Sequence, residues 1–232
     1  MKKFFEELLK TEKDLGVHPD QHSYFLSQDT KPYTAVLAVH GFLANPIDTQ
    51  AIGTYLHAQG NVDVLGIRMS GHGLTPERLK NTHWQEWVAS VHRGYKALKA
   101  NYEKVVLLGI SGGALVALNL AEENPADGII CLSTMLHAAD WRLKYGGPVG
   151  PVVHTVMKNV FQKEYLDSNV PEHRKHIVYN RMPIASTIEL FKLMRYTRRS
   201  LYRVECPMLI VHSTQDDVAH PSSAKELYQK VL

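Results

Sequence analysis

The chain of 232 residues contains only two cysteines, Cys131 and Cys206. So few thiols exclude a disulfide framework, and we expect reduced cysteines in a cytoplasmic protein. Long hydrophobic runs are also absent, because every apolar stretch is broken well before the roughly 18 residues of a membrane span. The N-terminal residues include acidic side chains where an export signal needs an apolar core. We therefore expect no export signal and no stable insertion into a membrane.

The chain also lacks the motifs of several binding functions. It has no Gly-Lys-Ser or Gly-Lys-Thr of a Walker loop and no glycine pattern of a dinucleotide fold. Its histidines lack the spacing to cysteines or carboxylates that metal sites need. The formal net charge is only +3, although residues 141–203 are basic, which indicates a solvated surface or contact with an acidic substrate or anionic lipid. We expect no cofactor, no metal and no nucleic-acid partner.

The most informative stretch runs from residue 104 to residue 120. A short apolar run leads into Gly-Ile-Ser-Gly-Gly at 109–113, and a second apolar run follows. This order predicts a buried strand, a sharp turn and a buried helix. In a Gly-x-Ser-x-Gly turn the bend leaves no room for side chains at the two outer glycines, here Gly109 and Gly113. The pattern predicts that Ser111 is a nucleophile; the alternative is a glycine-rich turn of a phosphate-binding fold.

The rest of the chain alternates between predicted strands and predicted helices. Apolar runs indicate strands at 34–40, 62–68, 128–134 and 208–212, with a shorter one at 22–26. Helical periodicity is found at 2–14, 84–102, 187–204 and from 222 onward. We also expect Asp48 to cap a helix that ends at Gly60. The alternation predicts an α/β fold whose mostly parallel sheet carries helices on both faces and functional groups at its strand ends.

Several motifs lie at these predicted strand ends. They are His40-Gly41-Phe42, Arg68-x-x-Gly71-His72-Gly73, Trp84, the turn at 109–113 and residues 216–224. In them the sequence resembles the α/β-hydrolase family, specifically the small bacterial carboxylesterases and monoacylglycerol lipases. The resemblance implies one α/β-hydrolase domain over residues 1–232. Within it, residues 1–32 form an N-terminal extension outside the likeness, and residues 138–187 form a cap insertion.

The resemblance also implies a catalytic site around Ser111. The backbone N–H groups of Phe42 and Gly112 match the oxyanion hole of the family. Asp216 matches the acid of the catalytic triad. Asp217 and Asp140 are the alternatives for this acid.

The triad histidine does not occur where the family places it. In the family it follows one more strand after the acid, but no histidine follows His220 here. We expect it beyond residue 232, together with the last strand and helix of the fold. His40 and His72 match positions that are usually structural. The other histidines that we consider are His137, His154, His173 and His176.

These residues imply a serine ester hydrolase of the carboxylesterase or monoacylglycerol lipase type. It would act through an acyl-enzyme on Ser111, with a small-molecule ester or monoglyceride as substrate. The alternatives are a catalytically impaired hydrolase-fold binding protein or a fragment, and an acyltransferase. The sequence leaves the substrate-binding residues and the oligomeric state open.

Overall fold

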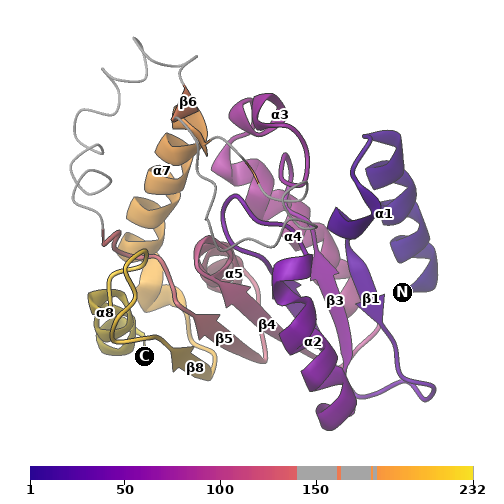
Figure 1. The fold of residues 1–232 in the computed structure, drawn as a ribbon. Coiled ribbons are helices and arrows are strands. Elements are labelled where there is room, and N and C mark those ends of the chain that lie inside the picture. Colours follow the sequence, from indigo (N-terminus) through magenta and orange to yellow (C-terminus); the bar gives the residue numbers. More distant parts are fainter. Residues whose placement is uncertain (140–160, 163–178, 180–181, 232) are drawn as a thin grey trace.

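The structure of the protein is a computed structural model that describes residues 1–139, 161–162, 179 and 182–231. Its centre is a six-stranded sheet with the strand order β1-β3-β2-β4-β5-β8 (Figure 1). The strands are β1 (Tyr24–Leu26), β2 (Thr34–Val39), β3 (Asp63–Ile67), β4 (Lys104–Ile110), β5 (Gly128–Leu132) and β8 (Met208–Val211). Every neighbouring pair is parallel except β1 and β3, which are antiparallel. The predicted mostly parallel sheet is confirmed.

Helices pack on both faces of this sheet. They include α1 (Lys2–Asp14), α2 (Ile47–Gly60), α3 (Pro76–Lys80), α4 (Trp84–Lys99), α5 (Gly112–Glu123), α7 (Ile184–Ser200) and α8 (Ser222–Lys230). Figure 1 shows α2 on one face and α4 and α5 on the other. Successive residues of a strand point to opposite faces, so Val36 packs with Leu56 of α2 while Leu37 joins the core that contains Leu115 of α5.

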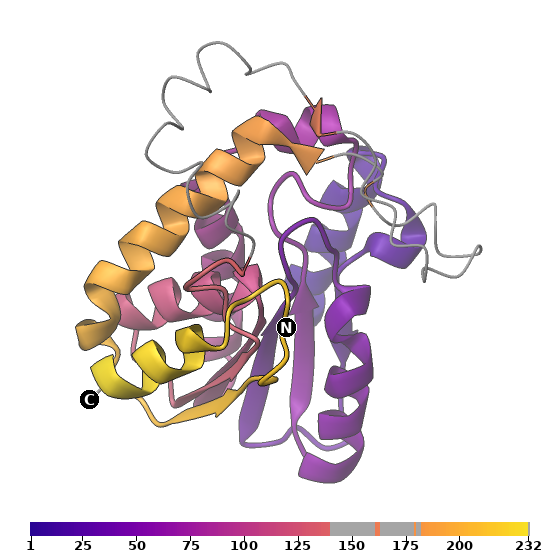
Figure 2. The same cartoon turned by 60° about the vertical axis from the view of Figure 1, so that its left-hand side comes forward.

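Helix α7 extends the layer formed by α4 and α5. After a 60° turn, Figure 2 shows α7 running beside α5, with α8 next to the C-terminal end of α7. The sequence placed a helix at 187–204, whereas α7 begins at Ile184 and a 3₁₀ helix, Leu201–Arg203, follows it. No described helix combines the length and the apolar character that a membrane span requires.

The N-terminal segment is part of the same body. Helix α1 has the bounds that the periodicity predicted, and Phe4, Phe5 and Leu8 pack against the main core. Strand β1 then pairs with β3, with Phe25 opposite Leu65. Part of the segment predicted as an extension therefore forms the edge of the sheet.

Most of the predicted cap at 138–187 lies outside the described residues. Within it, β6 (Phe161–Gln162) and β7 (Met182–Pro183) form an antiparallel pair just before α7. The boundaries of the cap stay a prediction.

Candidate active site

Ser111 lies at the sharp bend between β4 and α5. Its backbone has φ 52° and ψ −113°, a conformation that residues with a side chain rarely adopt. The surrounding sheet holds this bend in place, since the N–H of Ser111 donates to the carbonyl of Leu132 at 2.8 Å. The side chain is partly exposed at the C-terminal edge of the sheet. The strained strand-to-helix bend that the sequence predicted is present.

The two outer glycines of the motif are required by close backbone contacts. A Cβ atom on Gly113 would lie 2.2 Å from the carbonyl oxygen of His40, and one on Gly109 would lie 2.4 Å from Cα of Ala114. Real Cβ atoms essentially never come this close to other heavy atoms. The bend at Ser111 therefore forms only because both positions lack a side chain.

The loop after β2 packs directly against this bend. A Cβ on Gly112 would be 3.1 Å from the backbone nitrogen of Phe42, and one on Gly41 would be 3.8 Å from Cβ of Ser111. The loop is held by Asp48, whose Oδ2 accepts the N–H of Gly41 at 3.2 Å. The predicted cap at Asp48 is wrong, because α2 has Pro46 as its N-cap and no side-chain cap bond. Asp48 instead holds the loop beside Ser111.

Two buried imidazoles support the same loop. His40 accepts the N–H of Met69 at Nε2, 3.1 Å away, so its Nδ1 carries the proton and donates to the carbonyl of Gly41 at 2.8 Å. Burial lowers the pKa of His40 well below its usual value, and the neighbouring His72 and Arg68 act in the same direction. His40 is therefore neutral at pH 7 and ties the loops after β2 and β3 together.

His72 fills the space between these loops and α4. Its ring meets those of His40, Phe42 and Trp87 edge-on, with centroids 5.2, 5.9 and 5.3 Å away. Burial lowers the pKa of His72 to about 4, so this ring is also neutral at pH 7. Its Nδ1 lies 3.2 Å from the carbonyl of Ser70, whereas the buried Nε2 has no hydrogen-bond partner among the described residues.

Asp216 lies on the same edge of the sheet as Ser111. Ser111 follows β4 and Asp216 follows β8, and both strands run parallel to β5, which lies between them. Ser133, directly after β5, connects the two positions, since its N–H donates to the carbonyl of Val211 at 2.8 Å. The topology thus places the two predicted residues two strands apart at one edge.

The Asp216 carboxylate is held by hydrogen bonds from its own loop. Its Oδ1 accepts the N–H groups of Val218 at 3.0 Å and Ala219 at 2.8 Å. Burial raises the pKa of Asp216, but these two bonds, the Ser133 side chain and His212 together bring it below its usual value. Asp216 is ionised at neutral pH. Asp217, the first alternative, is exposed, and Asp140, the second, lies outside the described residues.

No hydrogen bond joins a histidine to the Ser111 hydroxyl within the part of the chain that the structure describes. His137 contacts Glu226, and His220 contacts Ser222 at the start of α8. His212 has its Nε2 2.9 Å from the carbonyl of Ala219 and 3.6 Å from Oδ2 of Asp216. The remaining candidates, His154, His173 and His176, lie outside the described residues.

The sequence did not reveal several residues that position this site. Ser133 has φ 46° and contributes to the low pKa of Asp216, but serine after a strand is too common to be a signal. Glu12 of α1 is fully buried and binds Arg68, 3.3 Å away, which in turn donates to the carbonyl of His72 at 2.7 Å. The motif Arg68-x-x-Gly71-His72-Gly73 indicated one end of this contact only.

Comparison with known proteins places this geometry in a family. The family model described as serine aminopeptidase, S33, matches residues 30–232. The chain is 30% identical over 200 residues to a thermostable monoacylglycerol lipase of Bacillus sp. (strain H-257), covering 84% of this chain and 76% of that protein. It is 26% identical over 208 residues to a carboxylesterase of Bacillus subtilis (strain 168), covering 87% and 82%.

The fold has solved counterparts as well. A structure from work on LipS and LipT, two metagenome-derived lipolytic enzymes, superposes with a TM-score of 0.77. The sequence identity is 20%, and the alignment covers 93% of this chain and 84% of that one. At this identity the likeness shows the α/β-hydrolase fold.

Proposed function

Because the chain belongs to the serine aminopeptidase, S33, family of α/β-hydrolases, we propose that it cleaves carboxylic esters with Ser111 as its nucleophile. The chain is a carboxylic ester hydrolase, like the monoacylglycerol lipase and the carboxylesterase to which it is similar. The observation that carries the serine mechanism is the bend at Ser111, with φ 52° and the Phe42 backbone nitrogen next to Gly112. A hydroxyl on such a bend faces the solvent edge while the helix N-terminus lies beside it.

The proposed reaction proceeds in two steps. Ser111 Oγ attacks the acyl carbon, and its proton passes to a histidine base that Asp216 orients. The carbonyl oxygen becomes an oxyanion, which accepts hydrogen bonds from the backbone N–H groups of Phe42 and Gly112. The base returns the proton to the leaving alkoxide, so an alcohol departs and an acyl-enzyme remains. Water then attacks the acyl-enzyme in the same way and releases the acid.

The proposed substrates are monoglycerides or esters with short or medium acyl chains. The relatives named as monoacylglycerol lipase and carboxylesterase support this class. Apolar side chains beside Gly112 support it as well, since Cβ of Phe42 and Cδ1 of Leu190 would lie 3.0 and 3.5 Å from a Cβ at this position.

The proposal is tested by covalent labelling and turnover. We expect a fluorophosphonate probe to add one adduct per chain at Ser111, and the protein to hydrolyse p-nitrophenyl butyrate. Ser111→Ala should abolish labelling and lower kcat by at least about 10³-fold, since the nucleophile is lost. Ser27→Ala, which changes an exposed loop serine, is the matched control and should keep both. Labelling that persists in Ser111→Ala, or an unreactive wild-type protein, would contradict the serine mechanism.

A further inference from the structure

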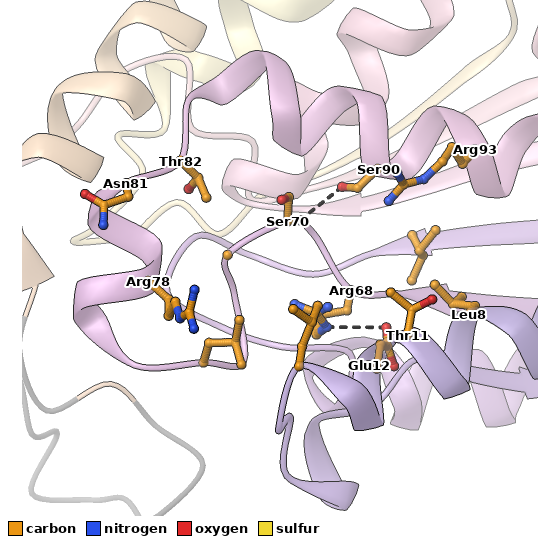
Figure 3. A pocket seen from close by; sticks show the side chains of 14 residues that line it. Leu8, Thr11, Glu12, Arg68, Ser70, Arg78, Asn81, Thr82, Ser90 and Arg93 are labelled. Atoms are coloured by element: carbon orange, nitrogen blue, oxygen red, sulfur yellow. Dashed lines mark hydrogen bonds and ion pairs between the residues drawn. The ribbon is translucent and has the colours of Figure 1, made fainter.

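A cavity lies between α1, the loop after β3, α3 and α4 (Figure 3). Its volume is about 300 Å³, at the lower end of the range for small-ligand sites. Ser111, Phe42, Gly112 and Asp216 are not among the residues that line it. This cavity is therefore separate from the candidate active site.

Arginines from three segments surround the cavity. Figure 3 shows Arg68 from the end of β3, Arg78 from α3 and Arg93 from α4 around one hollow, with Glu12 on the α1 side. Glu12 is fully buried and binds Arg68, with Oε1 3.3 Å from Nε. Glu12 also accepts the N–H and hydroxyl of Ser23 at 2.8 and 2.6 Å. The negative charge of Glu12 is thus already balanced by Arg68.

Arg78 and Arg93 bring two positive charges to the cavity that no described carboxylate compensates. Neither guanidinium has an ion pair or a side-chain hydrogen bond within residues 1–139, 161–162, 179 and 182–231. Among the described residues that line the cavity, Glu12 is the one carboxylate, and it already pairs with Arg68. Both side chains are exposed and line the same hollow, so an anion that enters it is attracted by the charges of both Arg78 and Arg93.

The wall also offers neutral donors and an apolar part. The hydroxyls of Thr82 and Ser90 are engaged with the carbonyls of Leu79 and Trp87, at 2.8 and 2.7 Å. The Asn81 amide and the Ser70 hydroxyl have no hydrogen bond within the described residues. The apolar part of the wall consists of Leu8, Leu15, Ile67 and Leu74. The cavity thus combines an apolar wall with two guanidiniums and two neutral donors that have no described partner.

From this arrangement we infer that the cavity binds a small organic phosphomonoester. Its dianionic phosphate balances the charges of Arg78 and Arg93, whose planar guanidiniums donate paired hydrogen bonds to phosphate oxygens. The short carbon part lies against the leucines. The site is separate from Ser111, so its occupancy does not depend on ester hydrolysis.

Calorimetric titration tests this inference. Glycerol 1-phosphate is titrated into the protein at an ionic strength fixed with sodium chloride, and inorganic phosphate is titrated in parallel. We expect saturable binding of one equivalent of glycerol 1-phosphate. Arg78→Gln combined with Arg93→Gln should weaken it at least about tenfold, because both charge-assisted contacts are lost. Vesicles that contain phosphatidate, compared with phosphatidylcholine vesicles, show whether a lipid headgroup supplies the same phosphomonoester.

The matched control changes two exposed arginines of α7, Arg195→Gln and Arg199→Gln. This variant loses the same net charge away from the cavity and should bind glycerol 1-phosphate as the wild type does. All three proteins should have the same far-ultraviolet circular dichroism, because the four arginines are exposed. A Kd of about 1 mM is a weak affinity. The inference is overturned if none of these phosphates shows saturable binding when titrated to about 10-fold above that concentration. Equal weakening in the control variant also overturns it, since the effect would then reflect net charge alone.

Discussion

The nucleophile side of the candidate active site, around Ser111, and the acid side, around Asp216, are held in place by different forces. Ser111 follows β4, which lies between β2 and β5 in the interior of the sheet. The backbone packs so closely at this bend that a Cβ on Gly113 would lie 2.2 Å from the carbonyl oxygen of His40. Asp216 follows β8 at the sheet edge, where Leu209 and Val211 are 56% and 50% exposed. The nucleophile side depends on close packing, whereas the acid side depends on hydrogen bonds and charges.

Helix α8 shows how the acid side is stabilised. Glu226 contacts His137 after β5, Arg198 of α7 at 3.2 Å and Lys230 at 2.7 Å. Lys230 belongs to α8 itself, whereas His137 and Arg198 join this helix to the segment after β5 and to α7. The segment after β5 also contacts the Asp216 loop, because the N–H of His220 donates to the carbonyl of His137. Such contacts weaken with salt and acid, while steric contacts do not.

We expect the largest loss of stability on the nucleophile side from Gly113→Ala. The added Cβ would meet the carbonyl oxygens of His40 and Val39 at 2.2 and 2.4 Å, and backbone atoms of a central strand cannot yield as a flexible side chain does. We expect the free energy of unfolding to fall by about 3 kcal/mol or more. Urea unfolding followed by circular dichroism measures it.

Gly128→Ala in β5 is the control for this prediction. A Cβ there has its closest contact at an ordinary 3.6 Å, to the carbonyl of Pro207. We expect a change of less than about 1 kcal/mol. If Gly113→Ala were no more harmful than Gly128→Ala, close packing would not be what fixes the bend at Ser111.

The ion pair between Glu12 and Arg68 tests whether a charge interaction also contributes to stability on the nucleophile side. It is a charge interaction in a region that close packing and neutral hydrogen bonds also hold, and both side chains are almost fully buried, at 0% and 6% exposure. Glu12→Gln keeps an acceptor for Ser23 but leaves the Arg68 charge unbalanced. We expect a loss of about 3 kcal/mol in the free energy of unfolding, measured by urea unfolding.

Glu6→Gln, an exposed change on the same helix, is the control and should alter stability by less than about 0.5 kcal/mol. Equal stability of the two variants would mean that α1 is attached by its apolar face alone. Phe4, Phe5 and Leu8 would then carry the contact.

The smallest effect is expected on the acid side, from Glu226→Gln. Burial raises the pKa of Glu226, but hydrogen bonds from Lys230, His137 and Arg198 outweigh it and lower this pKa to about 2. The folded-state pKa is below the unfolded value of about 4.3, so the ionised group stabilises the fold above about pH 4.3. This contribution disappears as the pH falls towards 2. Because solvent screens these contacts, we expect Glu226→Gln to cost ~1 kcal/mol at pH 7.

Urea unfolding of Glu226→Gln and wild type at pH 7, 4 and 3 measures this difference. It should shrink towards low pH and also in 1 M salt, where charges are screened within about 3 Å. The exposed change Glu205→Gln serves as the control and should match the wild type throughout. A difference that stayed constant from pH 7 to pH 3 would show that the acid side is not held by this charge.

The local pattern of the chain was sufficient for most of the fold. Apolar runs predicted β2 and β4, their alternation with helices predicted a mostly parallel sheet, and periodicity predicted α1 from residue 2 to residue 14. The Gly-x-Ser-x-Gly motif predicted the bend at Ser111, because its geometry depends on neighbours within a few residues. The errors were local as well. Aspartate is a residue type that often caps helices, but the carboxylate of Asp48 accepts a hydrogen bond from the N–H of Gly41 instead.

Only the tertiary structure decided which distant residues meet. Nothing in the sequence pairs Glu12 with Arg68, 56 positions later, or sets Ser133 beside Asp216. The same holds for the cavity that Arg78 and Arg93 surround. The physical reason is that periodicity reports which face of an element is apolar, whereas contacts between polar groups depend on how whole elements pack. The sequence alone thus determined the fold class and the nucleophile candidate, and packing determined the groups around them.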